Sequence, residues 1–305
     1  MSEVPMGSRD DVLAGGGTGG TTSSPMAFPI PAEELGAVSI VPNGSFEAGS
    51  YQTFVLTYVA GKFGIDDSGS MRVCFRFASD QTRPQFEDPK GPNYTTIEAS
   101  NNAVLTYHYD PKGNVRPWDR TLYIKVVRGF LREGDKITIT FGDRSGGSPG
   151  MRLQTFCEDS YEFHTLIDPI ATYCYQPMPV QPVIKIIPGK PDRYLAVAPT
   201  IRAIDESFSI KFKGEDKWGN PSDQCDIKLY PRASHPVKNL PDMISLKPGE
   251  FFGVIDGLSV ADAADLHIDF LDDAGALMCR TNPIRIESAP LSRHFWGDLH
   301  GQSEE

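Results

Sequence analysis

Three side chains in the last few residues of the sequence are of the types that bind metal ions. Asp298, His300 and Gln302 occupy alternate positions. Alternate side chains of a β-strand project from the same face, so these three would form one row while Leu299 points into the packing layer. Oxygen and imidazole groups are the usual protein ligands of divalent cations. The sequence therefore predicts that Asp298, His300 and Gln302 supply the first ligands of a divalent metal, whose remaining ligands come from other segments.

The residues around this row carry a family resemblance. FWGDLHGQSEE, residues 295–305, resembles the opening strand of a poorly characterised family of large proteins related to the polymerase-and-histidinol-phosphatase (PHP) metallo-hydrolases. KFGIDDSGSMRVCFRFASD, Lys62 to Asp80, resembles a segment that precedes the hydrolase domain in those proteins. In PHP enzymes this strand reads H-x-H, and both histidines bind metal. His300 falls on the first of these positions, but Gln302 replaces the second, and its neutral amide oxygen is a weaker ligand than an imidazole.

The resemblance implies a metal-dependent hydrolase acting on phosphate or related esters, in which clustered metals activate a water. Asp298 would be a ligand or would orient one. The resemblance also implies that this chain consists of non-catalytic accessory β domains followed by the first strand of a truncated hydrolase domain. One incomplete strand cannot form a pocket, so we expect this chain by itself to be inactive and to hold no metal. The expected partner is the missing C-terminal hydrolase domain, and homo-oligomer formation is left open.

An internal copy of the same tripeptide illustrates the alternative interpretation of these residue types. Asp265-Leu266-His267 lies in a run where Leu266, Ile268 and Phe270 alternate with polar residues. That alternation predicts an ordinary half-buried strand with a solvated face. The terminal copy differs, because Phe295, Trp296 and Gly297 break the alternation before it.

Composition limits the class of protein. The chain has 305 residues, 39% of them hydrophobic, which is enough for about two domains. Its 29 glycines and 25 prolines favour many short strands joined by turns. A net charge of −11 argues against nucleic acid or an anionic membrane as partner. No apolar run is long enough for a membrane span.

Cysteine usage and the amino terminus indicate the compartment. The five cysteines are odd in number and widely spaced, which predicts reduced, buried thiols rather than disulfides or a zinc site. Met1 to Pro25 lacks the basic and apolar regions of a secretory signal. We therefore expect a cytoplasmic protein.

The chain is expected to be all-β, with two tandem antiparallel β-sandwich domains. Residues 1–36 are rich in Gly, Ser, Thr and Pro and are predicted to be a disordered tail. Residues 37–176 are predicted to form the first sandwich from strands near 51–59, 71–77, 104–109, 121–127 and 136–141. In the second of these strands Val73, Phe75 and Phe77 are expected to share the buried face.

Two long loops interrupt the predicted first sandwich, at 79–93 and 142–150. Long loops on a rigid sandwich often bind ligands, and Arg83, Glu87 and Asp88 are available for this. No convergent acid, base and nucleophile appears in either loop, so we favour a structural role, in which they cover a sheet edge or pack on a neighbouring domain.

A proline-rich stretch, residues 177–182, is predicted to be a stiff linker to a second β domain at 183–288. The segment Asp216-Lys217-Trp218-Gly219-Asn220-Pro221 is similar to the D-x-x-G-N-P turn of bacterial immunoglobulin-like repeats, which implies an immunoglobulin-like fold for this domain. Residues 289–305 are then the start of the truncated PHP-like domain.

A second functional hypothesis belongs to a different class. The chain would be a β-sandwich binding or spacer module that recognises carbohydrate or protein and has no enzymatic activity. Exposed aromatic platforms would favour it, and Trp118 and Trp218 are the candidates, although single aromatic residues in turns usually serve packing.

Overall fold

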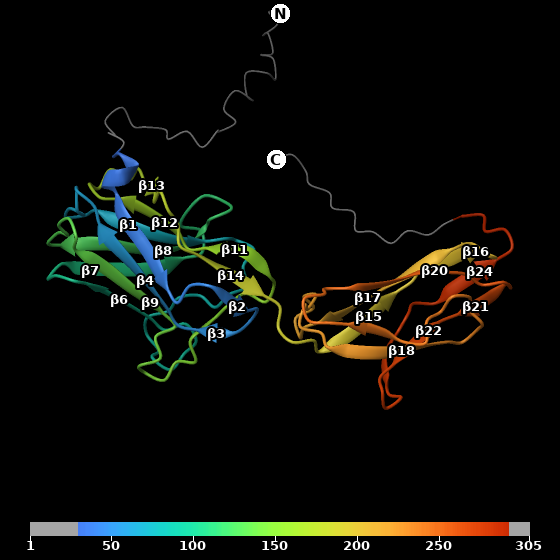
Figure 1. Cartoon of the computed structure of the whole chain (residues 1–305). Coiled ribbons are helices and arrows are strands. Elements are labelled where there is room, and N and C mark those ends of the chain that lie inside the picture. Colours follow the sequence, from blue (N-terminus) through green and yellow to red (C-terminus); the bar gives the residue numbers. More distant parts are fainter. Residues whose placement is uncertain (1–29, 293–305) are drawn as a thin grey trace, which may run out of the picture. The chain divides into compact units, whose positions relative to one another are not determined.

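The computed structural model describes residues 30–292, so the predicted metal ligands Asp298, His300 and Gln302 lie outside the described residues. The chain divides into two compact units (Figure 1). The first comprises residues up to 43, 52–151 and 162–183, and the second comprises 44–51, 152–161 and the residues from 184 onward. Within the described range, no helix is long and apolar enough to cross a membrane.

The first unit contains two antiparallel sheets. One has the order β1-β4-β9-β6, and the other has the order β13-β12-β5-β8-β7. The strands of the first are β1 (Gly36–Val41), β4 (Phe54–Ala60), β9 (Lys136–Phe141) and β6 (Thr95–Ala99). Those of the second are β13 (Gln176–Pro177), β12 (His164–Asp168), β5 (Ser70–Phe75), β8 (Arg120–Arg128) and β7 (Val104–Asp110). The only regular helical element of the described chain is a single 3₁₀ turn, η3 (Ala32–Glu34).

Four phenylalanine rings form the centre of the first unit. Phe54 and Phe141 come from one sheet and Phe75 from the other, and Phe163 precedes β12. The Phe75 ring lies 5.8 Å from that of Phe141 and 5.6 Å from that of Phe163, both edge to face. All four side chains are buried, and each contributes about 1.5–3 kcal/mol by leaving water. The predicted all-β sandwich is therefore confirmed.

The prediction that Val73, Phe75 and Phe77 share one buried face is wrong at Phe77. Val73 and Phe75 are buried as expected, but β5 ends at Phe75, and Phe77 is exposed with the Arg116 guanidinium 5.0 Å from its ring centre. Cys74, which points to the other face of the strand, is buried as expected and packs against Thr121, whose Oγ1 lies 3.5 Å from its Sγ. Both faces of β5 are covered here, so the two-residue alternation no longer separates buried from exposed side chains.

The predicted tail and linker are both shorter than expected. Ile30 and Leu35 are buried in the first unit, and the Ile30 amide donates to Gln176 Oε1 at 3.0 Å. Met178 is buried, and the Gln181 side chain bonds both main-chain groups of Thr165, at 2.7 and 3.0 Å. Residues 30–36 and 177–182 thus belong to the first unit, because their main-chain polar groups find partners there.

The second unit also consists of small sheets. Its strands are β15 (Arg193–Val197), β17 (Phe208–Glu215) and β20 (Gly253–Leu258) in one sheet; β16 (Ile201–Ala203), β24 (Ile284–Glu287) and β21 (Ala264–Leu266) in a second; and β19 (Ile244–Leu246), β18 (Ile227–Ala233), β22 (Ile268–Leu271) and β23 (Leu277–Arg280) in a third. Five other strands occur earlier in the chain: β2 (Ser45–Glu47), β3 (Tyr51–Gln52), β10 (Met151–Arg152), β11 (Glu158–Glu162) and β14 (Val183–Ile187). Most pairs are antiparallel, but β14 pairs with β2, and β16 with β24, in parallel.

The D-x-x-G-N-P turn forms as predicted and binds several segments together. Asp216 Oδ1 accepts hydrogen bonds from the Trp218 and Asn220 amides, at 2.9 and 3.0 Å, and Oδ2 accepts one from Gly189 N at 3.1 Å. Asn220 Nδ2 donates to the Thr155 carbonyl at 2.9 Å. The buried Asp216 carboxylate therefore holds both the turn at 216–221 and the segment at Gly189 in place.

Candidate functional site

The internal Asp-Leu-His copy is structural. Asp265 forms an ion pair with Arg285 at 2.9 Å, and the His267 amide donates to Ser234 Oγ at 3.0 Å. Leu266 and Ile268 are buried, as the predicted half-buried strand requires, although the strand is interrupted at His267 between β21 and β22. The His267 imidazole lies beside Asp269, with Nε2 4.0 Å from Oδ1.

No metal site is present among the residues that the structure describes. Between residues 30 and 292, no three His, Cys, Asp or Glu side chains are grouped so that they could hold an ion. Asp298, His300 and Gln302 lie beyond that range. Their donor atoms, a carboxylate, an imidazole and an amide oxygen, suit a divalent metal chemically, and the metal site stays a prediction.

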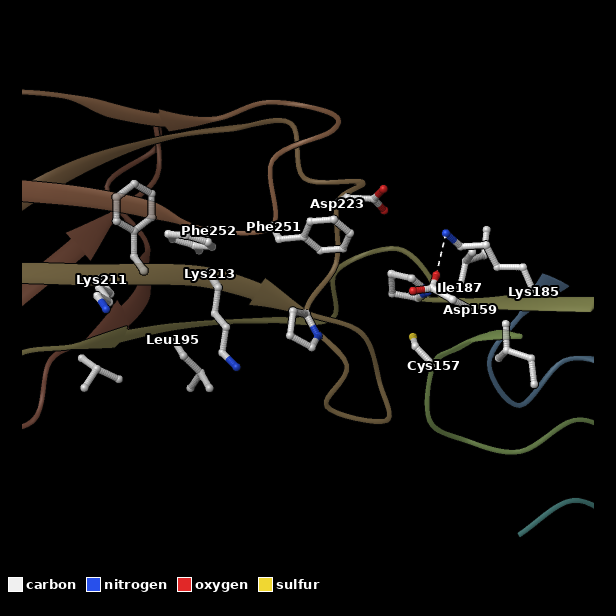
Figure 2. A pocket seen from close by; sticks show the side chains of 15 residues that line it. Cys157, Asp159, Lys185, Ile187, Leu195, Lys211, Lys213, Asp223, Phe251 and Phe252 are labelled. Carbon is white, nitrogen blue, oxygen red and sulfur yellow. Dashed lines mark ion pairs between the residues drawn. The ribbon is translucent and has the colours of Figure 1, made fainter. Parts of the chain in front are cut away.

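The second unit carries a groove of about 790 Å³ that the sequence did not reveal. We call it the β15–β17 groove. Its floor is the outer face of the sheet that contains β15, where Leu195 lies opposite Lys213 and Val197 lies opposite Lys211. Leu195 and Val197 are exposed while Ala196 between them is buried. The floor therefore presents apolar side chains to solvent in alternation with lysines (Figure 2).

Two exposed phenylalanines form one rim of this groove. Phe251 and Phe252 directly precede β20, which begins at Gly253. Phe252 is 60% exposed, the more open of the two. Gly253 is needed at this point because a Cβ there would meet the buried Phe212 ring at 2.2 Å. Gly253 therefore packs closely on the Phe212 ring where β20 begins, and Phe251 and Phe252 lie outside the strand.

The opposite side of the groove contains Cys157, Asp159 and Lys185. Lys185 and Asp159 form an ion pair at 2.7 Å, shown by the dashed line in Figure 2. Desolvation of the thiol, with Asp216 and Asp223 nearby, raises the pKa of Cys157 to about 11. The thiol is therefore protonated and poorly nucleophilic at neutral pH. No histidine is among the described residues that line the groove, whose titratable side chains are carboxylates, lysines and the Cys157 thiol.

A second groove, of about 720 Å³, lies in the first unit between the loop at 79–93 and β7. We call it the β7 groove. The Phe86 ring of the loop lies 4.8 Å from the ring of Tyr107, and Arg83 and Glu87 are also among the lining residues. The loop thus lies beside an edge strand, one of the two structural roles that we expected for it.

The other predicted functional positions have packing partners. The Trp118 ring stacks on His164 at 4.7 Å, and Trp218 Nε1 donates to the Ala48 carbonyl at 3.0 Å while the ring remains partly exposed. In the loop at 142–150, Asp143 accepts hydrogen bonds from Ser145 N and Thr96 Oγ1, both at 2.9 Å. The structure does not bring these residues together into a common site.

Comparisons with known proteins assign no family. No protein-family profile matches the chain, and no curated protein matches it either. Among solved structures, the adhesin InvE of Yersinia pseudotuberculosis is similar at 9% identity with a TM-score of 0.24, over 83% of this chain and 58% of that one. Red sea bream transglutaminase is similar at 11% identity with a TM-score of 0.23, over 83% of this chain and 31% of that one. At these scores neither likeness bears on function.

Proposed function

We propose that residues 30–292 are the non-catalytic accessory β region of a metal-dependent hydrolase that resembles the PHP family and acts on phosphate or related esters. The hydrolase part rests on the motif that contains Asp298, His300 and Gln302. The accessory part rests on one observation. The unit that directly precedes this motif along the chain has an open, largely apolar groove with exposed phenylalanines on one rim, and the pKa of its Cys157 thiol is raised.

In this proposal the β15–β17 groove holds part of the hydrolase domain. Contiguous exposed apolar side chains such as Val197 and Phe252 are typical of protein interaction sites. Lys213 pairs with Glu215 at 2.8 Å, whereas Lys211 forms no ion pair within residues 30–292, so an acidic group on the occupant would complement it. Seven residues lie between the end of β24 at Glu287 and Phe295, and these eight Cα steps reach at most about 27 Å, which keeps the next domain close to this unit.

Metal analysis of the natural protein, with any residues that follow Glu305, tests the hydrolase part. We expect bound divalent metal in the unmodified protein and a clear loss in His300→Ala. His267→Ala is the matched control, because His267 occupies the same tripeptide between β21 and β22, where the described residues form no metal cluster. Unchanged metal stoichiometry in His300→Ala would remove this residue from the site and with it the main support for the proposal.

Limited proteolysis of the same protein tests the occupant of the groove. Phe252→Ser should speed cleavage within residues 288–294, because an undocked domain exposes the connecting chain. Val115→Ser is the control, since Val115 is also an exposed apolar residue, 78% accessible, but lies in the first unit. Equal cleavage rates in both variants would show that the groove does not hold the domain.

The alternative is a β-sandwich binding or spacer module that recognises carbohydrate or protein and has no enzymatic activity. The β7 groove favours it, because aromatic and charged side chains meet there away from any predicted metal ligand. The natural reading frame separates the two. Further clusters of His, Asp and Glu beyond Glu305 would support the hydrolase, and a stop codon there would support the binding module.

A further inference from the structure

The loop that forms one side of the β7 groove is held in a single conformation by its own polar groups. Gln85 Oε1 accepts hydrogen bonds from the Glu87 and Asp88 amides, at 3.1 and 3.0 Å, and Gln85 Nε2 donates to the Asp88 carbonyl at 2.8 Å. Asn93 is fully buried, and its Nδ2 donates to the Thr82 carbonyl at 2.7 Å. The groove is therefore preformed, which lowers the entropic cost of binding a ligand.

Aromatic rings make up the apolar part of this groove. Tyr107 and Tyr109 are alternate residues of β7 and so face the same side of this edge strand. Tyr107 is 37% exposed, and its ring is braced by Phe86 at a tilt of 55°. Exposed, fixed aromatic faces are suited to stacking on the C–H face of a sugar ring, because the ring face carries negative charge density and the C–H groups are weakly positive.

Charged side chains of both signs surround the rings. Arg83 and Glu87 are exposed, and neither forms an ion pair within residues 30–292. Asp88, in contrast, caps its own loop by accepting from Lys90 N at 2.9 Å. Asp88 also lines the groove, so one guanidinium and two carboxylates surround the rings and disfavour an anionic ligand. The Arg83 and Glu87 groups are planar, and each can bind two neighbouring hydroxyls at once.

We propose that the β7 groove binds a short uncharged oligosaccharide, with one sugar ring on Tyr107 and its hydroxyls on Arg83 and Glu87. The volume of about 720 Å³ lies within the range of ligand sites, roughly 300–1,000 Å³. The site is independent of the motif at Asp298 and His300, so it stands or falls separately from the hydrolase proposal.

A proline-rich peptide is the competing ligand for an aromatic groove. Proline has no N–H, so such a segment offers mainly carbonyl acceptors, which suit Arg83 and leave the Glu87 carboxylate unpaired. A sugar hydroxyl both donates and accepts and therefore satisfies both residues. This difference favours the oligosaccharide.

Titration calorimetry against three uncharged trisaccharides (maltotriose, cellotriose and laminaritriose), the acidic trigalacturonate and a proline-rich decapeptide tests the inference. We expect one or more of the uncharged trisaccharides to bind and trigalacturonate and the decapeptide not to bind. Tyr107→Ala should weaken the binding about tenfold or more, and Arg83→Gln by about tenfold, as for a lost hydrogen bond to a charged group. Tyr173→Ala is the control, because Tyr173 is a tyrosine of the same unit outside the groove, 74% exposed against 37% for Tyr107.

Folding of the variants is verified before their affinities are compared. Both Tyr107 and Arg83 are partly or fully exposed, so the variants are expected to fold, and far-UV circular dichroism with a thermal melt verifies this. Binding of the decapeptide alone, absence of binding by all three uncharged trisaccharides, or equal affinity in Tyr107→Ala and Tyr173→Ala would each overturn the inference.

Discussion

Removing the Asp216 carboxylate should destabilise the second unit strongly. The side chain is buried, and its two oxygens accept hydrogen bonds from the amides of Gly189, Trp218 and Asn220 and from the Asn220 side chain. Hydrogen bonds to a charged group contribute about 1.5–3 kcal/mol each, and they are not additive within one network. Asp216→Ala also leaves buried donors without partners. We therefore expect a loss of about 4 kcal/mol, or roughly 8–16 °C in Tm for a unit of this size.

Urea unfolding followed by Trp218 fluorescence, with calorimetry for Tm, measures this loss. Asp272→Ala is the matched control, because Asp272 also shapes a turn, accepting from the Ala274 and Ala276 amides at 3.0 and 2.8 Å, but in a solvent-exposed hairpin. There water replaces the lost acceptor, and we expect a cost of about 1 kcal/mol. If Asp216→Ala costs no more than Asp272→Ala, the buried carboxylate does not hold the unit together as argued.

The same carboxylate makes stability depend on pH. Burial opposes its ionisation, but the hydrogen bonds from Asn220, Gly189 and Trp218 outweigh burial and lower the pKa of Asp216 below its ordinary value. The ionised form is therefore favoured in the folded state, so its contribution is complete above the unfolded pKa of about 3.9 and is lost as pH falls through the lowered folded pKa. In Asp216→Asn this acid-dependent part of the unfolding free energy should disappear, which a urea titration between about pH 5 and pH 2 measures.

Two further predictions concern the β15–β17 groove. Gly253→Ala should lower stability by about 1–3 kcal/mol, because its Cβ would meet the Phe212 ring at 2.2 Å, whereas Gly189→Ala, whose nearest contact is 3.7 Å, should be nearly neutral in the same unfolding assay. Iodoacetamide should modify Cys157 slowly at pH 7 and faster as pH rises towards 11, because its pKa is raised, while buried Cys74 stays unmodified in the folded protein by peptide mass spectrometry. Rapid labelling of Cys157 at neutral pH would show that the thiol is more acidic than its surroundings imply.

The sequence determined the elements whose signals are local. The sequence predicted strands near 121–127 and 136–141, and the structure has β8 and β9 there, with Leu122, Ile124, Ile137 and Ile139 buried. The turn at Asp216 followed from the types of residue that close a turn with their own side chains. The prediction that the cysteines are buried holds for Cys74 and Cys225 but not for Cys157, which is exposed.

Only the tertiary structure decided which of the remaining side chains face solvent and which meet. Residues 44–51 and 152–161 join the second unit although they lie within the predicted first domain. Phe252 of the β15–β17 groove and Tyr107 of the β7 groove stand in stretches that look like ordinary strand or core sequence. The periodicity of a strand separates its two faces, but whether a face is covered depends on segments distant in the chain, such as the loop beside β7. For that reason the sequence placed the strands, and the packing between distant segments made the two grooves.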